Sequence, residues 1–99
     1  MSNNLIKIDP IKRLETLLDN SNKFIDHYFS FDEVNEFVKE AKYCAIISQS
    51  YEEAAVIRDI ERQICRRIDE QAESDKEEIK NFITLVGSAI SAVLCKIKN

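Results

Sequence analysis

Residue types that could support catalysis are sparse in this chain. His27 is the single histidine, and it stands among aromatic residues. No Ser/His/Asp set can be assembled by spacing, so we expect no catalytic residues and place His27 at a boundary or on the surface. Several carboxylates have the distribution typical of solvated helix faces: Glu52, Glu53, Glu61, Asp69 and Glu70. The sequence therefore predicts a protein that is not an enzyme.

The three cysteines do not form a recognisable metal or disulfide pattern. Cys44, Cys65 and Cys95 are odd in number and far apart in the sequence, which fits neither a zinc pair nor a disulfide framework. We expect them to be small apolar thiols in a reduced cytoplasm, and we expect no metal and no cofactor. The start of the chain, MSNNLIKID, lacks the charged-then-apolar pattern of a secretory signal, which agrees with a cytoplasmic location.

Arg58, Arg62 and Arg66 recur at intervals of four residues, which places them on one face of a helix. Like charges at this spacing repel one another, so something must offset them. One interpretation is a surface laced with salt bridges to Asp59, Asp69 and Glu70. A second is a face that binds an acidic partner, and a third is a contact with a nucleic-acid backbone. The net charge of −4 argues against general nucleic-acid affinity.

The stretch YEEAAVIRD, residues 51–59, contains the arginine that begins this series. Adjacent alanines, Ala54 and Ala55, remove side-chain bulk and predict a notch in which a neighbouring helix approaches closely. A large side chain of the preceding segment, Ile46 or Ile47, is expected to fill it. Tyr51 is expected to cover the end of a two-helix hairpin. The connection SQS is short, so the two helices should be antiparallel.

These residues resemble the UVR motif, the helical hairpin named from excinuclease subunits B and C. The motif has Phe or Tyr, then E-x-A-A-x, then Leu or Ile, then R-D. Its positions are matched by Tyr51, Glu52, Ala54, Ala55, Ile57, Arg58 and Asp59. The resemblance covers about residues 36–70, with a small residue at Ala45 and an apolar one at Ile64. Lys42 and Glu61 depart from it, because the family usually has apolar residues at both positions.

The resemblance implies a helical docking element for proteins, because such hairpins associate with other hairpins. It does not imply DNA repair, since the chain has no helicase loop, nuclease or Cys-x-x-Cys pair. Together with the arginine series, it predicts a set of partner-binding residues: Tyr51, Ala54, Ala55, Arg58, Asp59, Arg62 and Arg66.

Four helices are needed to position these residues. Asp9-Pro10 has the pattern of an N-cap followed by a proline in the first turn. Three further starts fit the capping box, in which Ser is followed three residues later by Glu. They are Ser30…Glu33, Ser50…Glu53 and Ser74…Glu77. The single glycine and single proline disfavour a β-rich fold and a phosphate-binding loop.

Apolar residues recur at helical spacing after each start. The first segment begins at Pro10 and is expected to resume after Asn22 through Phe24, Ile25 and Tyr28. The second covers about residues 31–48, the third about 51–72, and the fourth runs from near Asp75 to the C-terminus. We therefore predict an all-α bundle of about four helices with a central antiparallel hairpin, forming a single domain over residues 1–99 with a flexible segment at 1–8.

The last helix contains the apolar stretch FITLVGSAISAVLC. This stretch is shorter than the roughly 20 residues that span a bilayer, so we do not expect a membrane protein. Its small and polar residues, Thr84, Ser88, Ser91 and Cys95, are expected on one face. The opposite, apolar face should pack in the core or against a second copy of the chain: Phe82, Val86, Ala89, Ile90, Val93 and Ile97.

The sequence as a whole predicts a non-enzymatic, cytoplasmic protein–protein interaction module. It would act as an adaptor or regulator through the hairpin of residues 31–72, with a protein partner. One alternative is a structural protein that self-assembles into a homo-oligomer through its C-terminal helix. Another is a small nucleic-acid-associated regulator that uses the arginine series.

Overall fold

The computed structural model describes residues 9–23, 25, 30–73 and 75–98. They form four helices, α1 (Pro10–Lys23), α2 (Phe31–Ile47), α3 (Tyr51–Asp69) and α4 (Lys76–Lys98), and these ranges contain no strand. The predicted all-α bundle is thereby confirmed. The predictions for residues 1–8, Phe24, His27, Tyr28 and Ser74 concern positions outside the described residues.

The first two helices begin with the capping chemistry that the sequence predicts. Asp9 Oδ1 accepts hydrogen bonds from the backbone N–H groups of Ile11 at 3.0 Å and Lys12 at 3.2 Å. Ser30 Oγ accepts from the backbone N–H of Glu33 at 3.2 Å. Both caps satisfy N–H groups that have no partner within the helix, so each fixes where its helix begins.

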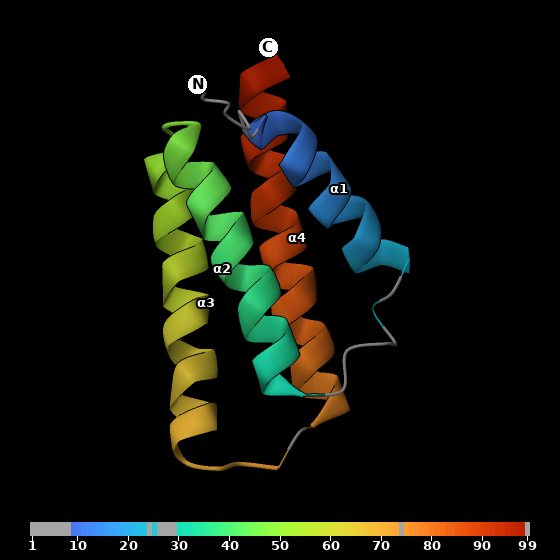
Figure 1. Cartoon of the computed structure of the whole chain (residues 1–99), viewed down its shortest axis with the longest axis vertical. Coiled ribbons are helices and arrows are strands. Elements are labelled where there is room, and N and C mark those ends of the chain that lie inside the picture. Colours follow the sequence, from blue (N-terminus) through green and yellow to red (C-terminus); the bar gives the residue numbers. More distant parts are fainter. Residues whose placement is uncertain (1–8, 24, 26–29, 74, 99) are drawn as a thin grey trace, which may run out of the picture.

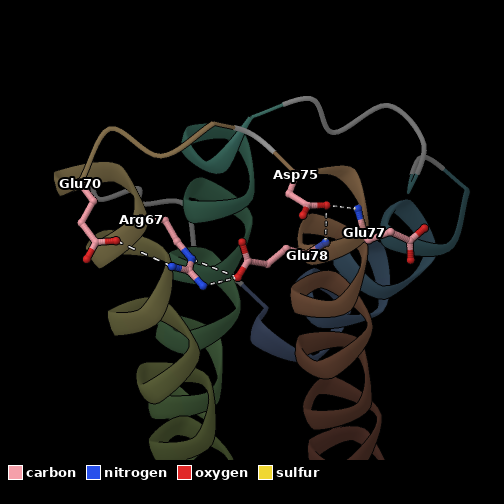
Figure 2. A network of polar contacts seen from close by, with 5 residues as sticks. All are labelled: Arg67, Glu70, Asp75, Glu77 and Glu78. Carbon is pink, nitrogen blue, oxygen red and sulfur yellow. Dashed lines mark hydrogen bonds and ion pairs between the residues drawn. The ribbon is translucent and has the colours of Figure 1, made fainter.

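The other two helices also begin where the sequence predicts. Ser50 occupies the N-cap of α3 without forming a side-chain hydrogen bond, and the Glu53 carboxylate binds Lys96 of α4 instead. At α4 the cap is Asp75, whose Oδ1 accepts from the N–H groups of Glu77 at 2.9 Å and Glu78 at 3.3 Å (Figure 2). The predicted side-chain hydrogen bonds of a capping box at Ser50 are therefore wrong, although the predicted start of α3 is correct.

Helices α2 and α3 end in the same hydrogen-bonding pattern, and in both a glutamine occupies the position that is usually glycine. After α2, Gln49 N–H donates to Ile46 O and Ser50 N–H donates to Ala45 O, both at 2.9 Å. This is the Schellman arrangement, in which the left-handed position usually holds glycine. Gln49 takes that position with φ of 63°, and Gln71 does the same after α3 with φ of 53°. Both turns therefore form without glycine.

All four helices contribute to one hydrophobic core. Helices α2 and α4 each contact the other three helices, whereas α1 and α3 do not contact one another. Every helix buries the apolar face that its periodicity predicts. The members of this core that are fully or almost fully shielded include Leu14, Val34, Val38, Ala41, Ile57, Ile64, Ile79, Val86, Ile90 and Val93. Ile25 packs against it at the edge, as do Ile11, Leu18, Ile68 and Ile97.

Helices α2 and α3 form the expected antiparallel hairpin and have the most extensive mutual contact in the molecule (Figure 1). Helix α4 lies behind this hairpin, and α1 crosses on the far side of α2 from α3 (Figure 1). Because α1 does not reach α3, no other described helix covers the outer face of the hairpin.

Helix α4 has the two faces that its sequence predicts. Phe82, Val86, Ala89, Ile90 and Val93 are buried, and Ile97 is half-buried. The polar face is exposed and carries Thr84, Ser88, Ser91 and Cys95. The apolar face thus packs within the chain itself.

By length and composition, one described segment could cross a membrane: Lys76–Ile97 of α4, with a mean hydropathy of 1.4 over its most apolar window. Half of that window is buried inside the protein. The core helix of a soluble protein has the same character, so this property is weak evidence for a membrane span.

Candidate docking surface on the α2–α3 hairpin

Arg58, Arg62 and Arg66 are all exposed on the outer face of α3, and we call them the arginine stripe. In the part of the chain that the structure describes, no carboxylate lies within ion-pairing distance of these three guanidinium groups. The interpretation in which Asp59, Asp69 and Glu70 neutralise the stripe is therefore wrong for these residues. Glu70 lies 3.7 Å from Arg67 instead.

The neighbouring residue Arg67 has a carboxylate partner on α4, and its direction explains why the three arginines of the stripe have none there. Successive residues of a helix are rotated by about 100°, so Arg67 points to a different side of α3 from Arg66. Its Nε and Nη2 donate to Glu78 Oε2 of α4 at 3.0 and 2.7 Å (Figure 2). This hydrogen bond raises the pKa of Arg67. The stripe faces away from α4 and has no comparable partner there.

A shallow pocket of about 290 Å³ lies at the end of the hairpin next to the α2–α3 turn. We call it the tip pocket, and it is continuous with the arginine stripe because Arg58 belongs to both. Its lining comes from both helices of the hairpin: Lys42, Ile46, Tyr51, Ala54, Ala55 and Arg58. The pocket is therefore an apolar depression with cationic groups at its edge.

Large apolar side chains are exposed around this turn. Tyr43, Ile46 and Ile47 belong to the last turns of α2, and Tyr51 opens α3; their exposed fractions lie between 43% and 64%. Among the described residues, six large apolar side chains are highly exposed, and four of them gather at this end of the hairpin. Single exposed apolar residues are ordinary, but a cluster beside a pocket marks an interaction surface.

The two alanines of the predicted notch differ in burial. Ala54 is buried with 6% exposure and belongs to the hydrophobic core. Ala55 is exposed, because it lies about 100° further around the helix. Ile46 and Ile47 do not fill a notch, since both side chains are exposed. Tyr51 is also largely exposed rather than covering the hairpin end.

The structure brings five of the seven predicted partner-binding residues into one exposed area, namely Tyr51, Ala55, Arg58, Arg62 and Arg66. Ala54 is buried but also lines the tip pocket, and Asp59 is exposed beside the stripe. Sequence reasoning missed Lys42 and Ile46 as part of this surface. Their four-residue spacing on α2 was the available signal, because it puts them on one face of that helix.

Lys42 and Glu61 connect the two helices of the hairpin. Lys42 Nζ lies 2.7 Å from Glu61 Oε1, and both side chains are largely shielded, with exposures of 26% and 12%. The two residues that depart from the UVR pattern therefore form an ion pair with one another. Lys42 is oriented by this bond at the edge of the tip pocket.

The other groups with reactive side chains are dispersed. Cys44 is buried, which raises the pKa of its thiol, and Cys95 is exposed on the far helix. Cys65 Sγ lies 3.8 Å from Asn35 Oδ1. Among the described residues, no three His, Cys, Asp or Glu side chains are grouped in a way that could hold a metal ion.

The fold and this surface define a small all-α bundle with a cationic, partly apolar outer face on a two-helix hairpin. Comparison with protein-family models, with curated proteins and with solved structures finds no match. The UVR resemblance of residues 36–70 therefore stays a prediction.

Proposed function

We propose that this protein is a non-enzymatic interaction module, an adaptor or regulator in the cytoplasm, which binds a protein partner through the outer face of the α2–α3 hairpin. The single observation that carries the proposal is the continuity of the arginine stripe with the tip pocket through Arg58. Exposed arginines without carboxylate partners next to exposed apolar side chains are characteristic of binding surfaces. The UVR resemblance agrees with such a role, because it implies a helical docking element.

Self-assembly through α4 is less well supported. The face that would form the interface carries Val86 and Ile90, and both are fully buried in the chain's own core. Its exposed face carries small polar residues such as Thr84 and Ser88, and in the described part of α4 Leu85 is the single large apolar side chain with high exposure. Such a face offers little apolar area for a stable interface between copies.

A test of the proposal is capture of partners from the native host with the full chain as bait. We expect Arg58→Glu to abolish capture of a partner that the wild type retains, while leaving the melting temperature nearly unchanged, because Arg58 is exposed and unpaired among the described residues. Lys12→Glu is the matched control, since Lys12 is exposed on α1, which does not contact α3.

A partner that Arg58→Glu still captures would contradict docking on the hairpin. An Arg58→Glu variant that unfolds would contradict it too, because the arginine would then be required for the fold. Equal loss of capture by Lys12→Glu would point to an effect of net charge instead of a defined surface.

A further inference from the structure

The arginine stripe has a fixed geometric period. A helix rises about 1.5 Å per residue, so Arg58, Arg62 and Arg66 succeed one another at about 6 Å and span about 12 Å. Ala54 and Ala55 of the tip pocket lie one helical turn before Arg58. An apolar site and three cationic sites therefore follow one another along α3 at intervals of one turn.

We infer that the occupant of this surface is an acidic amphipathic helix of a partner protein that lies along the outer face of the hairpin. It inserts one large apolar side chain into the tip pocket and presents carboxylates at intervals of four residues to Arg58, Arg62 and Arg66. The inference rests on the proposed function and names the chemistry of the partner.

Both the positive charge of the arginine stripe and its four-residue spacing favour an acidic helix as the occupant. A helix laid along α3 has the same rise per turn, so its residues at four-residue intervals stay opposite the stripe over two turns. Arginine binds carboxylates through two parallel N–H donors, and such pairs are stronger than neutral hydrogen bonds. The apolar side chain of the partner would cover Ile46 and Tyr51, which are both exposed. Removing this apolar surface from water adds to the binding energy.

A nucleic-acid backbone fits this surface less well. Duplex DNA carries one negative charge per 1.7 Å or so of its axis, and it requires many cationic contacts. Here three arginines stand beside the exposed carboxylates of Glu52 and Asp59, on a chain with a net charge of −4. An acidic helix presents its carboxylates at separate positions one turn apart, which can match the three arginines, whereas a duplex presents closely spaced phosphates along its whole length.

A second copy of the chain is also a weaker occupant. Its own α2 carries Asp32, Glu36 and Glu40 at the required spacing. However, Glu40 is already bound by Arg13, and Glu36 lies 3.8 Å from Lys39. Docking of one copy on another would have to break these pairs.

The test uses three synthetic helical peptides and fluorescence anisotropy with the full chain. The first has three glutamates at four-residue intervals and a leucine four residues beyond one end of this series. It is made in two versions, with the leucine before or after the glutamates, because the partner helix could run parallel or antiparallel to α3. The second has the same composition with the glutamates moved to different faces of the helix. The third replaces the leucine by alanine. We expect saturable binding of the first, and binding of the second and third weaker by about tenfold or more.

Two protein variants locate the binding site. Arg62→Glu should weaken the first peptide by about tenfold or more, because it places like charges opposite one another. Lys12→Glu should leave binding unchanged. A short DNA duplex and a mass measurement of the protein alone complete the design.

Each contrary outcome overturns the inference. Equal binding of the first two peptides would mean attraction by net charge only. Duplex binding that is tighter than peptide binding and is lost in Arg62→Glu would assign the stripe to nucleic acid. A dimeric mass lost in Arg62→Glu would assign it to a second copy. If no peptide binds while Arg58→Glu still abolishes partner capture, the acidic helix is wrong and the docking function stands; if capture is also unaffected, both fail.

Discussion

Lys42 and Glu61 form an ion pair across the α2–α3 interface, and they are the two positions at which the chain departs from the UVR pattern. Each charge is largely shielded from water, so each would be costly alone. Together they satisfy one another at 2.7 Å and leave the hairpin packing intact. Two departures that look independent in the sequence are therefore one compensated change in the structure.

This pairing predicts a strongly non-additive pair of substitutions. Lys42→Leu or Glu61→Leu alone should lower the free energy of unfolding by about 1–3 kcal/mol, because a shielded charge loses its partner. The double variant should unfold within about 1 kcal/mol of the wild type, since two apolar residues replace the pair. Urea unfolding of the four proteins measures the coupling. A double variant as unstable as the sum of the single variants would show that the ion pair is not formed.

The two adjacent alanines should respond very differently to added bulk. Ala54→Leu should destabilise the protein by about 1–3 kcal/mol, the usual cost of overpacking a buried site. Ala55→Leu should change stability by about 0.5 kcal/mol or less, because the site is exposed. It should nevertheless impair partner capture by narrowing the tip pocket. Thermal unfolding of both variants checks the contrast, and equal destabilisation would contradict the assigned rotation of α3.

The helix starts could be predicted from sequence because capping is local chemistry. Asp9 and Ser30 bond to N–H groups two or three residues away, which a short stretch of sequence reveals. Ser50 shows the limit of such reasoning. Its expected partner Glu53 is engaged by Lys96, 43 residues further along the chain, and no local pattern predicts that pairing.

The candidate site was predictable in composition but not in detail. The four-residue spacing placed Arg58, Arg62 and Arg66 on one face, and the structure places them together. Whether they find carboxylates depends on the rotation of α3 relative to α2 and α4, which is a tertiary property. For the same reason, the exposure of Ala55 could not be separated from the burial of Ala54 by residue type alone.

Negative charge should prevent folding when it is introduced on the buried face of α4 and should be tolerated on the exposed face. Val86→Asp with Ile90→Asp should abolish the folded state, because both side chains are fully buried. Ser88→Asp with Ser91→Asp adds the same charge on the exposed face and should remain folded. Circular dichroism and light scattering measure both. A folded Val86→Asp, Ile90→Asp variant with unchanged mass would show that this face belongs to neither a core nor an interface.

The contact between Glu53 and Lys96 should make stability depend on pH in the acid range. The hydrogen bond from Lys96 Nζ lowers the pKa of Glu53 below its usual value near 4.5. The carboxylate therefore contributes stability that is present above that value and is lost as the pH falls through the lowered pKa.

Glu53→Gln should consequently have a lower melting temperature than the wild type near neutral pH, and the difference should shrink in acid. Glu52→Gln is the control, because Glu52 lies further from Lys96, at 3.9 Å, and is almost fully exposed. A difference between Glu53→Gln and the wild type that persists unchanged below the lowered pKa would contradict the assigned contact.

Docking on the outer face of the hairpin is tested most directly by photo-crosslinking in the native host. A photoreactive residue at position 59, beside the arginine stripe, leaves the three arginines and the tip pocket in place. We predict a covalent adduct with a partner protein that disappears when Arg62→Glu is added, and none from the same residue at position 12 on α1. An adduct from position 12 of the same mass, or one at position 59 that survives Arg62→Glu, would contradict the assignment of this surface.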